Sequence, residues 1–95
     1  MLSEQRIVLE SVLDSLREVI PGRPELAPDT ELLDSGLLDS LGIISVVAML
    51  ETSHGVEFPA ELHAPETFTD PTALAGALTG VLAAVRANGE ERTPS

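Results

Sequence analysis

The chain has 95 residues, and its 16 acidic and 5 basic side chains give a formal net charge of -11 at pH 7. This charge repels nucleic acid and anionic lipid, so we expect basic partners, no nucleic acid and no membrane. The lack of Cys excludes a disulfide framework and a Cys-based zinc site. The length predicts one compact domain with a small core, and we expect a monomer. We expect it to be cytoplasmic, because no signal peptide or membrane span is recognisable.

Apolar residues recur at spacings of three and four between Ser3 and Ile20, which predicts an amphipathic helix. Ser3 suits the N-cap position, and Pro21 with Gly22 should end the helix. The predicted buried face consists of Leu9, Val12, Leu13, Leu16, Val19 and Ile20.

Residues 21–39 are rich in Pro and Gly and show no sustained period, so they are predicted to form a long connection. We expect it to be ordered, because four leucines can hold it on the core: Leu26, Leu32, Leu33 and Leu37. Its carboxylates do not have the spacing of an EF-hand, and we therefore expect no metal site.

A second helix is predicted from Ser40 to about His54, with Ser40 as its N-cap. Gly55 should follow its last turn in a left-handed conformation. Its core stripe is Ile43, Val46, Val47 and Leu50, continued by His54. The other side carries Leu41, Ile44, Ser45, Ala48 and Thr52. One stripe is enough for the core, so Leu41 and Ile44 are either covered by neighbouring loops or form a docking patch.

The first turn of this helix offers unpaired backbone N–H groups and the positive end of the helix dipole. A phosphodiester built on the Ser40 hydroxyl would fit there, and Gly42 would let it approach the backbone closely. The alternative is that Ser40 only caps the helix. A serine hydrolase using Ser40, Asp39 and a His is disfavoured, because no Gly-x-Ser-x-Gly elbow is present.

The segment from Phe58 to Phe68 leaves room for only a short helical turn, from which Leu62 and Phe68 should point into the core. Asp70 and Pro71 predict the start of a last helix, which Asn88 and Gly89 should end. Its expected buried face is Leu74, Leu78, Val81, Leu82 and Val85. An adjacent face of small residues suggests close contact with another helix: Ala73, Gly76, Ala77, Gly80 and Ala84. We expect a domain over residues 1–88 and a flexible tail over 89–95.

The tripeptide Asp39-Ser40-Leu41, entered through Gly36-Leu37-Leu38, resembles the attachment motif of acyl, peptidyl and aminoacyl carrier proteins. The resemblance extends from the first helix to about Asn88. It implies an all-α fold, a small four-helix bundle of acyl-carrier-protein type with a long first loop and a short third helix. It also implies that Ser40 carries a covalent 4'-phosphopantetheine derived from coenzyme A, with Asp39, Leu41 and Gly42 completing the attachment site.

A member of this family is not itself an enzyme and has no catalytic residues, because the prosthetic group supplies the reactive thiol. The implied partners are a phosphopantetheinyl transferase, an adenylating enzyme or acyltransferase that loads the carrier, and downstream condensing or transfer enzymes. In the family the helix after the Ser meets these enzymes. The predicted partner-binding residues are therefore Leu38, Leu41, Ile44, Ser45 and Ala48.

Fatty-acid carriers usually bear several carboxylates on this helix, whereas here Glu51 is its lone acid. The entry to the helix is more similar to free-standing aminoacyl carriers, including the D-alanyl carrier of teichoic acid modification. This similarity favours an acyl or aminoacyl thioester loaded by an adenylating enzyme, as in nonribosomal peptide biosynthesis. The alternatives are a polyketide or fatty-acid carrier, and a helical adaptor that binds partners through the helix after Ser40.

Overall fold

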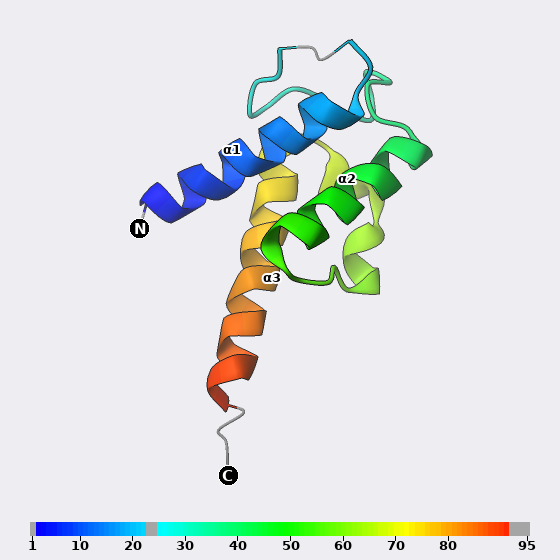
Figure 1. The fold of residues 1–95 in the computed structure, drawn as a ribbon. Coiled ribbons are helices and arrows are strands. Elements are labelled where there is room, and N and C mark those ends of the chain that lie inside the picture. Colours follow the sequence, from blue (N-terminus) through cyan, green and yellow to red (C-terminus); the bar gives the residue numbers. More distant parts are fainter. Residues whose placement is uncertain (1, 23–24, 92–95) are drawn as a thin grey trace.

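The computed structural model describes residues 2–22 and 25–91, and within these residues it is all helical (Figure 1). Three α-helices form, α1 (Leu2–Val19), α2 (Ser40–His54) and α3 (Pro71–Glu91). Two short 3-10 helices lie between α2 and α3, η1 (Ala60–His63) and η2 (Pro65–Phe68). Within the described ranges, no helix is both long and apolar enough to cross a bilayer.

The predicted short third helix is replaced by η1 and η2, so the expected count of four helices is not reached. The break falls at Ala64, whose backbone is extended, with φ -76° and ψ 153°. Pro65 causes this break, because a proline ring disfavours the helical conformation of the residue before it. Phe68 is fully buried as expected, whereas Leu62 is only half-buried.

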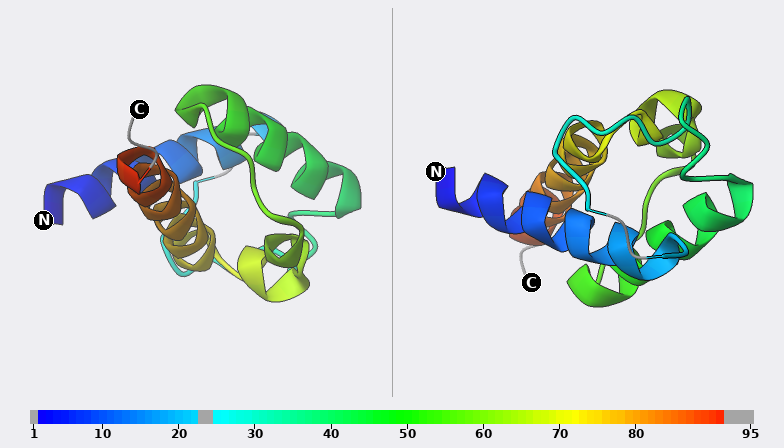
Figure 2. Two further views of the ribbon diagram at one scale, coloured as in Figure 1. Left: turned by 90° about the horizontal axis from the view of Figure 1, so that it is seen from below. Right: turned by 90° about the horizontal axis from the view of Figure 1, so that it is seen from above.

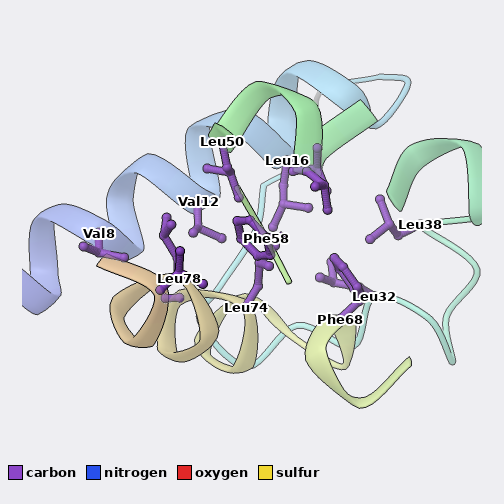
Figure 3. Close-up of a cluster of buried hydrophobic side chains, with 14 of the residues drawn as sticks. Val8, Val12, Leu16, Leu32, Leu38, Leu50, Phe58, Phe68, Leu74 and Leu78 are labelled. Carbon is purple, nitrogen blue, oxygen red and sulfur yellow. The ribbon is translucent and has the colours of Figure 1, made fainter. Parts of the chain in front are cut away.

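Helix α1 packs against both other α-helices, and η2 packs against α3. Figure 2 shows the loop before α2 running across the ends of these elements. The buried side chains meet between the helices, and Figure 3 shows Leu32, Leu38 and Phe68 grouped near the start of α2. The buried apolar residues of the three α-helices are Val8, Val12, Leu16, Val46, Val47, Leu50, Leu74, Ala75, Leu78 and Val81.

The long loop is held against the start of α3 by backbone hydrogen bonds. The N–H of Leu32 donates to the carbonyl of Thr69 at 2.9 Å, and the carbonyl of Pro28 accepts from Thr72 N at 3.0 Å. The Thr72 hydroxyl donates to the same carbonyl at 2.8 Å. Leu26 and Leu32 are buried, and Leu33 and Leu37 pack partly against the core. The predicted anchoring of this loop is therefore confirmed.

Helix α1 differs from its prediction at its start and on its buried face, whereas it stops before Pro21 and Gly22 as predicted. It begins at Leu2, so Ser3 lies inside the helix and is not its N-cap, and it ends at Val19. Val8 is buried although the predicted stripe omitted it, while Leu9, Leu13 and Val19 are only partly buried. From Val8 to Ile20 the buried apolar residues are spaced four apart. The buried stripe therefore lies on a slightly different helix face from the predicted one, and this face includes Val8.

Helix α3 also departs from the prediction. Asn88 and Gly89 do not stop it, because an interior Gly costs a helix only about 1 kcal/mol, and it continues to Glu91. Residues 89–91 of the predicted tail are thus helical, and residues 92–95 lie outside the described ranges. The second half of α3 projects beyond the other helices (Figure 1), which leaves Val85 48% exposed instead of buried.

The glycines of α3 do not mediate a close helix contact. A methyl group placed on Gly76 or Gly80 would have no neighbouring heavy atom within 4 Å, and both residues are exposed. The expectation that close packing against another helix compensates for the cost of two interior glycines is therefore wrong. Gly76 instead lines an open pocket between α3 and α1, together with Gln5 and Leu9.

Candidate functional site

The start of α2 is capped by Asp39 rather than by Ser40. The backbone of Asp39 is extended, with φ -105° and ψ -175°. Its Oδ1 accepts a hydrogen bond from the N–H of Gly42 at 2.8 Å, and its carbonyl accepts from Ile43 N at 2.8 Å. Asp is as good an N-cap as Ser, and a cap binds the N–H three residues later. Ser40 is therefore the first helical residue, which corrects its predicted role as the cap.

Because Asp39 caps the helix, the hydroxyl of Ser40 is not needed for capping, and Ser40 lies at the surface. Both Asp39 and Ser40 are exposed, and Leu41 next to them is 72% exposed. An α-helix leaves its first N–H groups without intrahelical partners, and Asp39 satisfies only the one on Gly42. The N–H groups of Ser40 and Leu41 thus remain at the helix start, together with the positive end of the dipole.

Leu38, predicted to bind partners, lies in the core instead. Its side chain is only 3% exposed, and it packs with Leu32 and Phe68 (Figure 3). The cause is a backbone hydrogen bond of 3.0 Å from Leu38 N to the carbonyl of Leu32, which folds the loop back on itself. The side chain of Leu38 is therefore not part of the exposed surface around Ser40.

The two sides of α2 separate as the helical angles predicted. Val46, Val47 and Leu50 are buried, and Ile43 packs partly against the core. On the other side Leu41 is 72% and Ile44 64% exposed, and Ser45, Ala48 and Thr52 are exposed as well. The sequence left open whether loops cover Leu41 and Ile44, and in the structure they do not. We call Leu41, Ile44, Ser45 and Ala48 the exposed α2 face.

Glu51, which carries the only carboxylate of α2, makes a structural contact. Oε2 of Glu51 accepts a hydrogen bond from the backbone N–H of Phe58 at 2.8 Å, and both residues are at least partly buried. Sequence reasoning missed this contact, because nothing local marks which N–H a Glu at a helix end will meet. The exposed α2 face therefore carries no charged side chain of its own.

Neither histidine adjoins Ser40 in a way that supports hydrolytic chemistry. Nε2 of His54 lies 2.9 Å from the hydroxyl oxygen of Ser11, a contact that joins α2 to α1. His54 is the last residue of α2 and Ser40 the first, which places them about 20 Å apart along the helix. His63 is exposed on η1. Among the described residues, no three His, Asp or Glu side chains form a group that could hold a metal ion.

The fold and the start of α2 together define a small helical domain in which an exposed Ser, Ser40, is the first residue of a helix. A family model described as a phosphopantetheine attachment site matches residues 10–78, which is more than half of the chain and includes all of α2. The chain belongs to this phosphopantetheine-binding family. A search of curated proteins gave no match.

Membership of the family establishes the general role of the chain. It is a carrier protein, and its cofactor is a covalently attached 4'-phosphopantetheine. Carrier proteins of this kind interact with a phosphopantetheinyl transferase and with partner enzymes, and they are generally not catalytic.

Proposed function

We propose that the Ser40 hydroxyl is the point at which phosphopantetheine is attached, and that an adenylating enzyme loads the resulting carrier. The observation that carries this proposal is the position of Ser40. It is exposed, it is the first residue of α2, and it directly follows the capping Asp39. It also lies inside the region that the family model matches.

The residues at the helix start fit the chemistry of the group. The Ser40 hydroxyl would form the phosphodiester, and the N–H groups of Ser40 and Leu41 would face its negative charge. An anion at a helix N-terminus is stabilised by roughly 0.3–1 kcal/mol at an exposed position. When bound, the group supplies a thiol that holds an acyl or aminoacyl group as a thioester. In this chain Asp39 would hold the first turn of α2, and Ser40 would be presented to solvent.

We further propose that partner enzymes bind the exposed α2 face, formed by Leu41, Ile44, Ser45 and Ala48. Two large apolar side chains that are more than half exposed make this face an apolar patch next to the attachment point. A helical adaptor without a prosthetic group would use the same face, and labelling of Ser40 separates the two functions.

The choice of an adenylating enzyme rests on the lack of charge on this face. Electrostatic complementarity steers partners toward charged surfaces, so a face without carboxylates depends on apolar contacts for its specificity. Glu51, the one acid of α2, is partly buried and accepts a hydrogen bond from Phe58 N near the end of the helix, so its carboxylate is not part of this face. A polyketide or fatty-acid carrier loaded by an acyltransferase is the alternative.

The attachment is tested by intact-protein mass spectrometry after incubation with coenzyme A, Mg²⁺ and a broad-specificity phosphopantetheinyl transferase. The wild type should gain the mass of one phosphopantetheine, and Ser40→Ala should gain none. The matched control is Ser53→Ala, which removes another exposed hydroxyl from the same helix but lies outside the exposed α2 face, and it should be labelled like the wild type. Because Asp39 and not Ser40 caps α2, Ser40→Ala should melt like the wild type. Label on a folded Ser40→Ala would refute the attachment point.

A further inference from the structure

Gly42 occupies a position in the first turn of α2 where a side chain has no room. A Cβ atom on Gly42 would lie 2.8 Å from Cδ1 of Leu38 and 3.3 Å from Oδ1 of Asp39. Carbon atoms in favourable contact lie about 3.5–4.0 Å apart, so Leu38 fills the space that this Cβ would need. Gly42 is helical, and the close approach of its neighbours is the reason for a Gly here.

Leu38 is not free to move aside. Its side chain is buried among Leu32 and Phe68, which are themselves fully buried (Figure 3). Its N–H donates to the carbonyl of Leu32, and the N–H of Leu32 donates in turn to the carbonyl of Thr69 at 2.9 Å. Displacing Leu38 would therefore disturb the packing that holds the loop against η2 and the start of α3.

Asp39 approaches the same glycine through the atom that caps the helix. Its Oδ1 binds the N–H of Gly42, so a Cβ on Gly42 crowds the capping oxygen as well. Leu38 and Asp39 immediately precede Ser40 in the chain. A backbone shift of these two residues would therefore move Ser40 as well.

We propose that Gly42 is a positioning residue: its lack of a side chain lets Leu38 and Asp39 both close on the first turn of α2, which sets the Ser40 hydroxyl for phosphopantetheine transfer. This inference rests on the proposed attachment at Ser40. Ala has a higher helix propensity than Gly, so Gly42→Ala favours the helix locally while it disturbs the position of Ser40. The transfer rate should therefore fall by more than the change in stability accounts for.

The test compares initial rates of transfer from coenzyme A to the apo protein, with melting of each variant followed by circular dichroism. Misplacement of a reacting group by about 1 Å can cost 10²-fold in rate, so we expect kcat for Gly42→Ala to fall by roughly 10- to 100-fold. The KM for the apo protein should stay near that of the wild type, because the exposed α2 face is unchanged. The matched control is Gly80→Ala, where a methyl group meets no neighbour and the rate should not change.

Rescue by a second substitution distinguishes positioning from a general structural effect. Leu38→Val removes the Cδ1 atom that the new methyl group would meet, so Gly42→Ala with Leu38→Val should regain rate relative to Gly42→Ala alone. If Gly42→Ala melts below the assay temperature, the double variant should also regain folding. A wild-type rate in folded Gly42→Ala, or no recovery in the double variant, overturns the inference. A wild type that takes no label, or a labelled Ser40→Ala, overturns the attachment point itself.

Discussion

Glu51 and Phe58 are joined by a hydrogen bond of 2.8 Å from the backbone N–H of Phe58 to the carboxylate Oε2 of Glu51. The backbone carbonyl of Glu51 also accepts from Gly55 N at 2.8 Å and from Val56 N at 3.2 Å. One residue thus receives three N–H groups from the chain that leaves α2. Glu51 therefore accepts hydrogen bonds from the residues that close α2 and also holds the segment that leads to η1.

Removal of this carboxylate should destabilise the fold. A hydrogen bond to a charged group contributes about 1.5–3 kcal/mol, so Glu51→Ala should lower the free energy of unfolding in urea by an amount near the lower end of this range. Glu51→Gln keeps an acceptor oxygen and should lose less. The control is Glu61→Ala, at an exposed position of η1, where we expect a change within about 0.5 kcal/mol. Equal losses at both positions would contradict a specific role for the Glu51 contact.

Leu50 and Ile44 lie on opposite sides of α2 and should respond differently to substitution. Leu50 is fully buried, so Leu50→Ala should cost about 2–5 kcal/mol of stability. Ile44 is 64% exposed, so Ile44→Asp should leave the Tm nearly unchanged while it slows transfer of phosphopantetheine or loading of the carrier. Thermal melting and labelling rates on the same samples check both statements. A large loss of stability in Ile44→Asp would show that Ile44 belongs to the core.

Substitution of Gly76 or Gly80 in α3 should affect stability in the opposite direction from substitution of Gly55, which ends α2. Gly76 and Gly80 are helical, exposed and free of neighbours, so Ala at either position should stabilise the protein by roughly 0.5–1 kcal/mol. Gly55 adopts a left-handed conformation with φ 66°, which costs an L-residue about 1–2 kcal/mol, so Gly55→Ala should destabilise it. Urea unfolding of the three variants measures the sign at each position. A stabilising Gly55→Ala would show that the left-handed end is not needed.

The proposed loading enzyme can be tested on the phosphopantetheine-bearing protein. It would be offered in parallel to adenylating enzymes with amino acids and ATP, and to a malonyl acyltransferase with malonyl coenzyme A. We expect an aminoacyl adduct by intact mass, because the exposed α2 face presents apolar contacts and no carboxylate to a partner. The apo protein is the control and should take neither group. Efficient malonyl loading without any aminoacyl adduct would favour the polyketide or fatty-acid alternative.

The sequence alone determined those features that depend on neighbouring residues along the chain. The periodicity of apolar residues placed the three α-helices and separated the two sides of α2. Asp70 caps α3 through a 2.8 Å hydrogen bond to Ala73 N, and Gly55 ends α2, both as predicted from residue type and position. The prediction of a phosphopantetheine carrier, confirmed by the family match, likewise came from a short stretch around Ser40.

Only the tertiary structure decided which groups meet across the chain and which side chains remain uncovered. Leu38 is buried because a hydrogen bond to Leu32 turns it inward, and Glu51 is occupied because Phe58 N comes within reach. Val85 is exposed because α3 extends beyond the helices that would cover it, although its spacing fits the buried stripe. Periodicity reports which side chains share a helix face, whereas burial requires a second element opposite that face, and where that element lies is set by the whole fold.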